Sequence, residues 1–135
     1  MQCMPRAIAT RGGSRLVEKV NLDEQFARFN DHWSPKIVAS LNDYDVKVVK
    51  VRGEFVWHQH DETDEFFLVT AGRLRIRLEA QDDVVLGPGE LLVVPRGVRH
   101  CPLADEETRV VLLEPQGTVN TGDAEVAGSV GERLA

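Results

Sequence analysis

The sequence contains only two cysteines, Cys3 and Cys101, and it has no long run of apolar residues. We expect Cys3 to lie in a floppy chain end, which argues against a structural disulfide. Without a long apolar run, we expect neither a membrane-spanning helix nor the apolar stretch of a secretory signal. These absences favour a cytoplasmic protein with reduced thiols.

Positive charge is also scarce in this chain. Lysine and arginine number 16 against 22 acidic residues, so the net charge is −6. Arg73, Arg75 and Arg77 alternate along one stretch, but no wider basic stripe accompanies them. We therefore expect no binding to nucleic acid or to an anionic membrane. The length of 135 residues and the apolar fraction of 42% suit one domain with one core.

The two ends of the chain differ in texture from its middle. Residues 1–20 lack periodicity, which predicts a flexible N-terminal arm. Residues 22–29, LDEQFARF, space their apolar side chains as a short helix does, and Asn21 is placed as its N-cap. Residues 117–135 are rich in glycine and small side chains, which predicts a poorly ordered C-terminal tail. One domain over residues 21–116 remains.

Short alternating runs separated by turn residues fill this domain from residue 37 onward. Examples are VKVVKVR at 46–52, RLRIRLE at 73–79 and TRVVLLE at 108–114. About eight such strands are expected, and no stretch between them is long enough for crossover helices. The pattern predicts an all-β antiparallel sandwich or barrel with a short N-terminal helix.

Three of the four histidines occur in turn and strand settings that can bring them together. His58 and His60 are two apart on a predicted strand, so both rings lie on one face. The polar DETD stretch lets the chain reverse and return Glu65 on the adjacent strand, and a Pro-Arg-Gly turn delivers His100. Imidazoles gathered on one face suit a metal ion. The candidate metal ligands are His58, His60, Glu65 and His100.

Two alternatives stay open at this point. Glu62 or Asp64 can replace Glu65 as the oxygen ligand, although Glu65 fits the strand geometry better. Glu65 can also act as a base instead of a ligand. His32 is interpreted as an ordinary hydrogen-bonded or exposed histidine.

Two stretches resemble the two motifs of the cupin superfamily. Residues 53–72 read GEFVWHQHDETDEFFLVTAG, and residues 89–100 read GELLVVPRGVRH. The first departs from the commonest form by a gap before His58 that is one residue shorter, and Ala104 stands where an Asn often follows the second motif. The resemblance covers about residues 37–114. It implies a double-stranded β-helix, or jelly-roll barrel, with a metal inside its mouth.

The resemblance extends to a group of small single-domain cupins described as mannose-6-phosphate-isomerase-like. Residues 22–60 and the stretch EPQGTVNTGD at 114–123 carry this part of it. Together with the ligand set, it implies one divalent transition metal ion (Fe, Mn, Ni, Zn, Co or Cu), a small-molecule ligand and a homodimer.

Three functions are compatible with these features, and we assign no catalytic residue. The first is a metal-dependent, isomerase-type enzyme acting on a small polar molecule such as a sugar or sugar phosphate. The second is an Fe-dependent dioxygenase that uses the two positions left open by four protein ligands. The third is a non-catalytic metal or small-ligand binding protein. We rank an enzyme first by a modest margin, and fold analogy supplies most of that margin, since this barrel hosts many unrelated chemistries.

Overall fold

The structure is a computed structural model that describes residues 16–134. Cys3 and most of the predicted N-terminal arm lie outside these residues. Within them, no helix has the length and apolar character needed to cross a membrane.

The helix predicted for residues 22–29 is present but short. It forms α1 (Leu22–Phe26), and Oδ1 of Asn21 caps it by accepting the N–H of Glu24 at 3.0 Å. Phe26 and Phe29 still belong to one apolar cluster. The turn that follows the helix places Phe29 in this cluster without a further helical turn.

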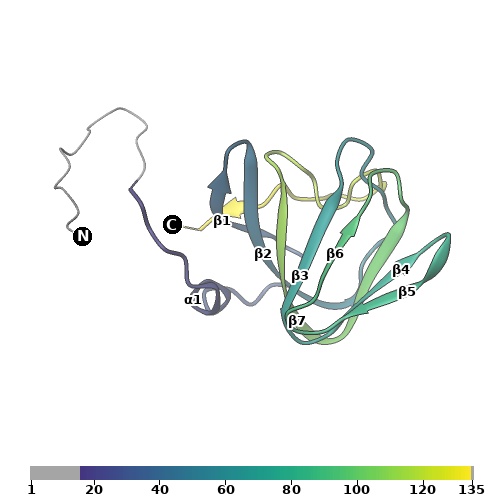
Figure 1. Cartoon of the computed structure of the whole chain (residues 1–135), viewed down its shortest axis with the longest axis horizontal. Helices are drawn as coiled ribbons and strands as arrows, with labels where there is room; N and C mark the ends of the chain where they lie inside the picture. Colours follow the sequence, from purple (N-terminus) through teal and green to yellow (C-terminus); the bar gives the residue numbers. More distant parts are fainter. Residues whose placement is uncertain (1–15, 135) are drawn as a thin grey trace, which may run out of the picture.

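Eight strands follow the helix in the described part of the chain. They are β1 (Lys36–Leu41), β2 (Tyr44–Glu54), β3 (Glu65–Ala71), β4 (Leu74–Leu78), β5 (Gln81–Leu86), β6 (Leu91–Val94), β7 (His100–Pro115) and β8 (Glu132–Arg133). The strands wrap into a barrel (Figure 1). The predicted all-β jelly-roll fold with a short N-terminal helix is confirmed.

Strand β7 is the central element of the barrel. One of its edges pairs with β2 along nearly its whole length, antiparallel from Tyr44↔Pro115 to Glu54↔Leu103. Its other edge pairs first with β4 and then with β3, while β3 also pairs with β6. A single long strand thus joins both halves of the barrel (Figure 1).

Alternation along the strands separates two apolar clusters. The inward residues of β2, β3 and β7 form the barrel core, which includes Val49, Phe67 and Val110. The outward residues Val48 and Val111 pack instead against α1. The same strands contribute to both clusters because successive residues of a strand point to opposite faces.

The C-terminal residues differ from their prediction. They were expected to form a poorly ordered tail from residue 117, but up to Leu134 they fold against the barrel. Asn120 and Ser129 join through a backbone hydrogen bond of 3.0 Å, Thr121 is buried, and β8 pairs in parallel with β1. The polar side chains of this segment find specific partners, which glycine-rich composition does not reveal.

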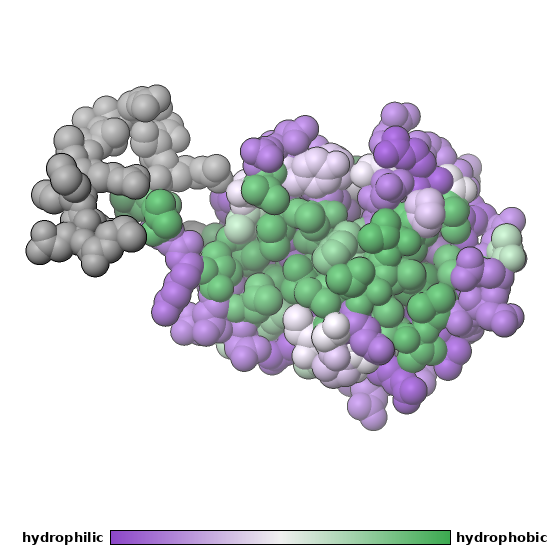
Figure 2. All heavy atoms as spheres, in the orientation of Figure 1, coloured by the Kyte–Doolittle hydropathy of each residue, from purple (hydrophilic) through white to green (hydrophobic). Residues whose placement is uncertain are grey.

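Apolar side chains also gather on the outside of the barrel. Figure 2 shows a broad hydrophobic area on the face where Figure 1 places β2, β3, β6 and β7. On β6, Leu91 is 56% exposed and Val93 is 46% exposed. Their cross-strand partners on β3 are Leu68 and Phe66.

Candidate metal centre

The structure brings His58, His60, Glu65 and His100 together inside the barrel, and all four are buried. The strand predicted to carry His58 and His60 is absent as a regular strand. Only His58 forms an isolated antiparallel bridge, with His100. The N–H groups of His58 and His100 each donate to the other's carbonyl at 2.9 Å. The two sequence motifs therefore meet directly at their ligands.

The turns expected from the sequence deliver the other two candidate ligands. Glu65 is the first residue of β3, directly after the polar turn, and it faces the barrel interior. The carbonyl of His60 accepts the N–H of Gly97 at 2.8 Å. Gly97 has φ +77, a left-handed conformation that glycine adopts without strain. The second-motif turn thus holds the backbone of the first motif.

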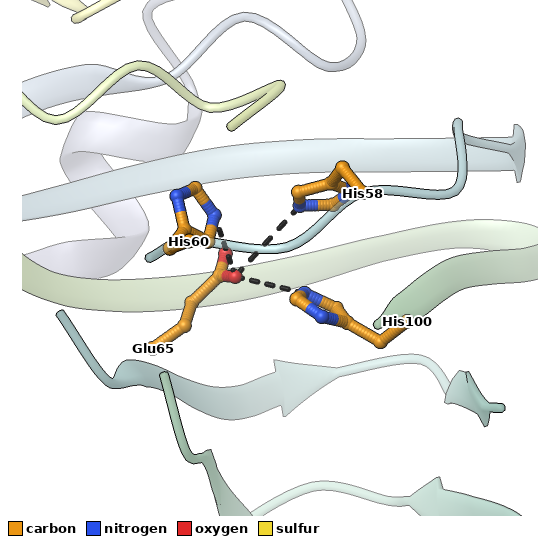
Figure 3. A group of neighbouring side chains, drawn as sticks. All are labelled: His58, His60, Glu65 and His100. Atoms are coloured by element: carbon orange, nitrogen blue, oxygen red, sulfur yellow. Dashed lines mark hydrogen bonds and ion pairs between the residues drawn. The ribbon is translucent and has the colours of Figure 1, made fainter. Parts of the chain in front are cut away.

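The three imidazoles converge on one carboxylate oxygen (Figure 3). Oε2 of Glu65 lies 2.9 Å from Nε2 of His60, 2.9 Å from Nε2 of His100 and 3.8 Å from Nε2 of His58. All four ligand atoms lie within 4.8 Å of one another. This spacing lets a single ion contact all of them after small adjustments.

The remaining ring nitrogens set the direction of two lone pairs. Nδ1 of His58 bonds the carbonyl of Val56 at 2.9 Å, and Nδ1 of His100 bonds that of Val98 at 2.9 Å. A carbonyl accepts only, so each Nδ1 donates its N–H, and Nε2 is the nitrogen of each ring that is left to bind a proton or a metal ion inside the barrel. Lone pairs that face a carboxylate repel it unless a cation or a proton lies between them. The donor set therefore fits a metal ion.

Electrostatics inside the cluster favour an ionised carboxylate. Burial alone would raise the pKa of Glu65, but its contacts with His100, His58 and His60 hold that pKa well below the ordinary value. Burial alone would lower the pKa of His60, but Glu65 raises that pKa above the ordinary value. Glu65 is thus an anion within a ring of imidazoles.

The alternative oxygen ligands lie outside the cluster. Glu62 and Asp64 are exposed, and Oδ1 of Asp64 accepts the N–H of Arg96 at 2.9 Å. His32 is exposed at the surface, with its Nε2 3.9 Å from Oε2 of Glu107, as its ordinary interpretation implied. Of the three acidic residues considered, Glu65 alone joins the histidines.

A small apolar pocket adjoins the cluster inside the barrel. His58 and Glu65 line it together with core side chains such as Phe67, Val110 and Leu112. Its free volume is about 30 Å³, enough for a molecule the size of water or dioxygen. Inward-facing residues of the barrel core thus form the wall beside the candidate metal centre.

Two aromatic rings stand at one side of this pocket. Trp33 and Phe55 stack with 4.6 Å between their centroids, and Phe55 meets His58 edge-on at 5.5 Å. Nε1 of Trp33 donates to the carbonyl of Arg52 at 2.9 Å, which orients the indole. Both rings belong to the lining of this pocket.

A second, more polar pocket lies on the other side of His60. Its volume is about 490 Å³, and it opens to solvent. Gln59, Asp61 and Thr63 line it, together with residues 115–119 and Asp123. The cluster therefore has an apolar side and a polar side.

Several residues around the centre were missed by the sequence reasoning. Asn120 and Asp123 belong to the segment predicted to be a loose tail, and only specific hydrogen bonds reveal their roles. Lys47 and Glu114 form a buried ion pair inside the barrel. They share the inward parity of their apolar neighbours, and that signal was available in the sequence.

Comparisons with known proteins agree with this geometry. A structure of a cupin-2 domain containing protein from Shewanella frigidimarina is 48% identical, with a TM-score of 0.69, and the match covers 71% of this chain and 93% of that one. The uncharacterized protein YdbB of Bacillus subtilis is 33% identical over 63 residues, which are 47% of this chain and 56% of YdbB. Acireductone dioxygenase of Bacillus licheniformis is 32% identical over 80 residues, which are 56% of this chain and 45% of that enzyme.

The chain thus spans about half the length of the two curated relatives. The mannose-6-phosphate-isomerase-like subgroup stays a prediction. The family model for the cupin domain matches residues 46–115, slightly more than half of the 135 residues. That stretch holds both motifs and all four clustered side chains. Motifs, barrel and family match agree, and the chain belongs to the cupin family.

Proposed function

We propose that His58, His60, Glu65 and His100 bind one divalent transition metal ion. The observation that carries this proposal is the convergence of three buried Nε2 atoms on one carboxylate oxygen. Nε2 of His58 and Nε2 of His60 are buried without a well-formed hydrogen bond, and ligation of a metal would satisfy both. Imidazole and carboxylate ligands suit Fe, Mn, Ni, Zn, Co or Cu, and no thiolate joins the set.

Elemental analysis of the purified protein tests the metal proposal. We expect close to one metal per chain in the wild type and a loss of metal in His58→Ala and His100→Ala. His32→Ala is the matched control, because it removes an imidazole outside the cluster. Unchanged metal content in both ligand variants would overturn the proposal.

The apolar pocket favours a dioxygenase among the three candidate functions. Four protein ligands leave two positions of an octahedral site open, and the pocket beside His58 and Glu65 admits a molecule the size of dioxygen. When bound, a metal such as Fe(II) supplies the site for dioxygen chemistry. The acireductone dioxygenase that resembles this chain over 80 residues adds support for this choice.

The protein's own residues would orient and shield this chemistry. The carbonyls of Val56 and Val98 hold two imidazoles, and the core residues that line the pocket give it an apolar wall. A dioxygenase needs no external reductant: an electron-rich organic substrate loses four electrons, dioxygen gains four, and both oxygen atoms enter the product. A thiol, a diketone or a phenol can provide these electrons.

Oxygen uptake by the protein reconstituted with Fe(II) tests this function. We expect consumption of one dioxygen per substrate with a member of a thiol, diketone and phenol panel, and ¹⁸O₂ should label the product twice. The same protein with Zn(II) is the control, since zinc has no redox chemistry. Tight retention of metal without uptake would instead indicate a binding protein.

A second candidate is the isomerase-type enzyme for a sugar or sugar phosphate. The polar pocket of about 490 Å³ beside His60 supports it, because amide, hydroxyl and carboxylate groups line that pocket and can bind hydroxyl groups. Its acidic residues Asp61, Glu62 and Asp123 favour a neutral sugar over a phosphate. Turnover of an aldose, ketose or uronate panel by the metal-loaded protein would establish it, and no turnover would count against it.

A homodimer and a cytoplasmic location stay predictions. Exposed Leu91 and Val93 on the outer face of the barrel support self-association, because apolar areas of this kind are often protein interfaces. Light scattering after size exclusion would give the mass in solution. A Leu91→Glu variant with a halved mass would identify the face, and cell fractionation would test the location.

A further inference from the structure

Gln59 lies between two candidate ligands, and its backbone is bound by the C-terminal segment. Its N–H donates to Oδ1 of Asp123 at 2.9 Å, and its carbonyl accepts the N–H of Asp123 at 3.1 Å. The backbone groups of the two neighbouring candidate ligands bond to a different part of the chain, the second motif. His58 pairs with His100, and the carbonyl of His60 accepts the N–H of Gly97. The ligand-bearing segment is therefore held between two separate parts of the chain.

The approach of the C-terminal segment to Gln59 is close enough to require a glycine. Gly122 has φ +53, and a Cβ at this position would collide with the carbonyl oxygen of Gln59. The same Cβ would come within 3.1 Å of Cδ2 of His58. The contact is thus one of backbone against backbone, which leaves the position of Gln59 little freedom.

The segment that carries Asp123 is itself anchored. Nδ2 of Asn120 donates to the carbonyl of Trp33 at 3.0 Å, and Oδ1 of Asn120 accepts the N–H of Ser129 at 2.7 Å. Nζ of Lys47 lies 3.3 Å from the carbonyl of Thr118. Asp123 therefore reaches Gln59 from a folded loop with fixed supports.

We propose that Asp123 is a positioning residue for the metal centre. By accepting the N–H of Gln59, it fixes the backbone between His58 and His60 and so the direction of their two Nε2 atoms. This inference rests on the proposed metal site and deepens it. Groups that orient ligands in this way typically change metal affinity about 10- to 100-fold when they are removed.

Cobalt(II) titration, followed by visible absorption, tests the role of Asp123. We expect Asp123→Ala to weaken Co(II) binding about tenfold and to change the d–d spectrum, because the imidazoles lose their fixed orientation. Asp123→Asn keeps an oxygen that accepts the N–H of Gln59, so it should restore the wild-type spectrum. Glu125→Ala is the matched control, since it removes the same charge from an exposed position of the same segment.

Different failures point to different conclusions. If wild-type protein binds no Co(II), both the metal site and the role of Asp123 are overturned. If the wild type binds and Asp123→Ala matches it in affinity and spectrum, the metal site stands and the positioning role is overturned. If Asp123→Ala lowers the melting temperature but leaves the Co(II) spectrum unchanged, the positioning role is likewise overturned. Gly122→Ala is a second variant, which should weaken Co(II) binding by displacing Asp123 from Gln59.

Discussion

Lys47 and Glu114 form an ion pair inside the barrel, with 2.7 Å between Nζ and Oε1 and side-chain exposures of 0% and 2%. Burial raises the pKa of Glu114, and the ammonium of Lys47 partly offsets that rise. Strands β3 and β7 are antiparallel, and Phe66 of β3 pairs with Leu113 of β7. The next residue of β7, Glu114, is therefore a cross-strand neighbour of Glu65, the residue before Phe66. The pair therefore lies beside the candidate metal centre and adds no net charge there.

Removing one member of this pair should cost more than removing both. Lys47→Met leaves a buried carboxylate without its counter-charge, which typically costs about 3 to 5 kcal/mol of unfolding free energy. Lys47→Met combined with Glu114→Met leaves no buried charge, and we expect it to recover most of that loss. Urea unfolding of the wild type, the two single variants and the double variant measures these differences. Additive losses in the double variant would contradict this expectation.

Glu65→Gln separates the ligand role of Glu65 from a role as base. The amide keeps the size of the side chain but removes the negative charge that faces the three imidazoles. If Glu65 is a ligand, we expect metal content and metal affinity to fall. The contrary result is full metal content with lost turnover, which would assign Glu65 as the base. Inductively coupled plasma analysis gives the metal content directly.

Acidity should affect the metal-free protein in two opposite ways. The pKa of His60 is raised from 6.5 by Glu65 despite burial, so its stabilising contribution is complete below about pH 6.5 and is lost as pH rises through the raised pKa. The pKa of Glu65 is lowered from 4.5 by the imidazoles despite burial, so its contribution is present above about pH 4.5 and is lost as pH falls through the lowered pKa. We expect the cluster to stabilise the protein from which a chelator has removed metal most between about pH 4.5 and about pH 6.5.

Melting temperatures of chelated protein across this pH range test the expectation. His60→Gln should flatten the decline on the alkaline side, because it removes the group that loses its proton there. Added metal should stabilise the wild type more at pH 8 than at pH 5.5, since metal and protons compete for the same nitrogens. An identical pH profile for wild type and His60→Gln would contradict the assignment.

Phe55→Ala should open the apolar pocket. Phe55 stacks on Trp33 and touches His58, and its removal leaves space next to the cluster. Phe55 is half-buried, so we expect a stability loss below the about 3 kcal/mol typical of Phe→Ala in a buried core, together with access for larger organic molecules. Thermal-shift screening with phenols of increasing size measures this, and Phe55→Leu serves as the variant that keeps most of the volume. Equal size limits in the wild type and Phe55→Ala would show that the aromatic pair does not control access.

Much of the site could be predicted because it depends on local patterns. The alternating strands predicted the barrel, and the polar DETD stretch and the Pro-Arg-Gly turn predicted that Glu65 and His100 approach His58. The exact pairing of His58 with His100 could not be predicted, because it depends on the register between distant segments.

The C-terminal segment shows where this reasoning stops. Its glycines and small residues resemble those of a disordered tail, yet Asn120 and Asp123 make specific hydrogen bonds with Trp33 and Gln59. Composition measures average apolar content, whereas this segment is held by a few polar contacts at particular positions. Such contacts become visible only when the partner backbone has been placed.

The backbone bridge between His58 and His100 also has a consequence for folding. It joins two motifs far apart in the chain, and β7 must pair with its neighbours before His100 reaches its place. Contacts of such long sequence separation form late, because closing the intervening loop costs entropy first. The unfolded chain then lacks the assembled cluster, so a bound ion would stabilise only the native state, in which this bridge is closed.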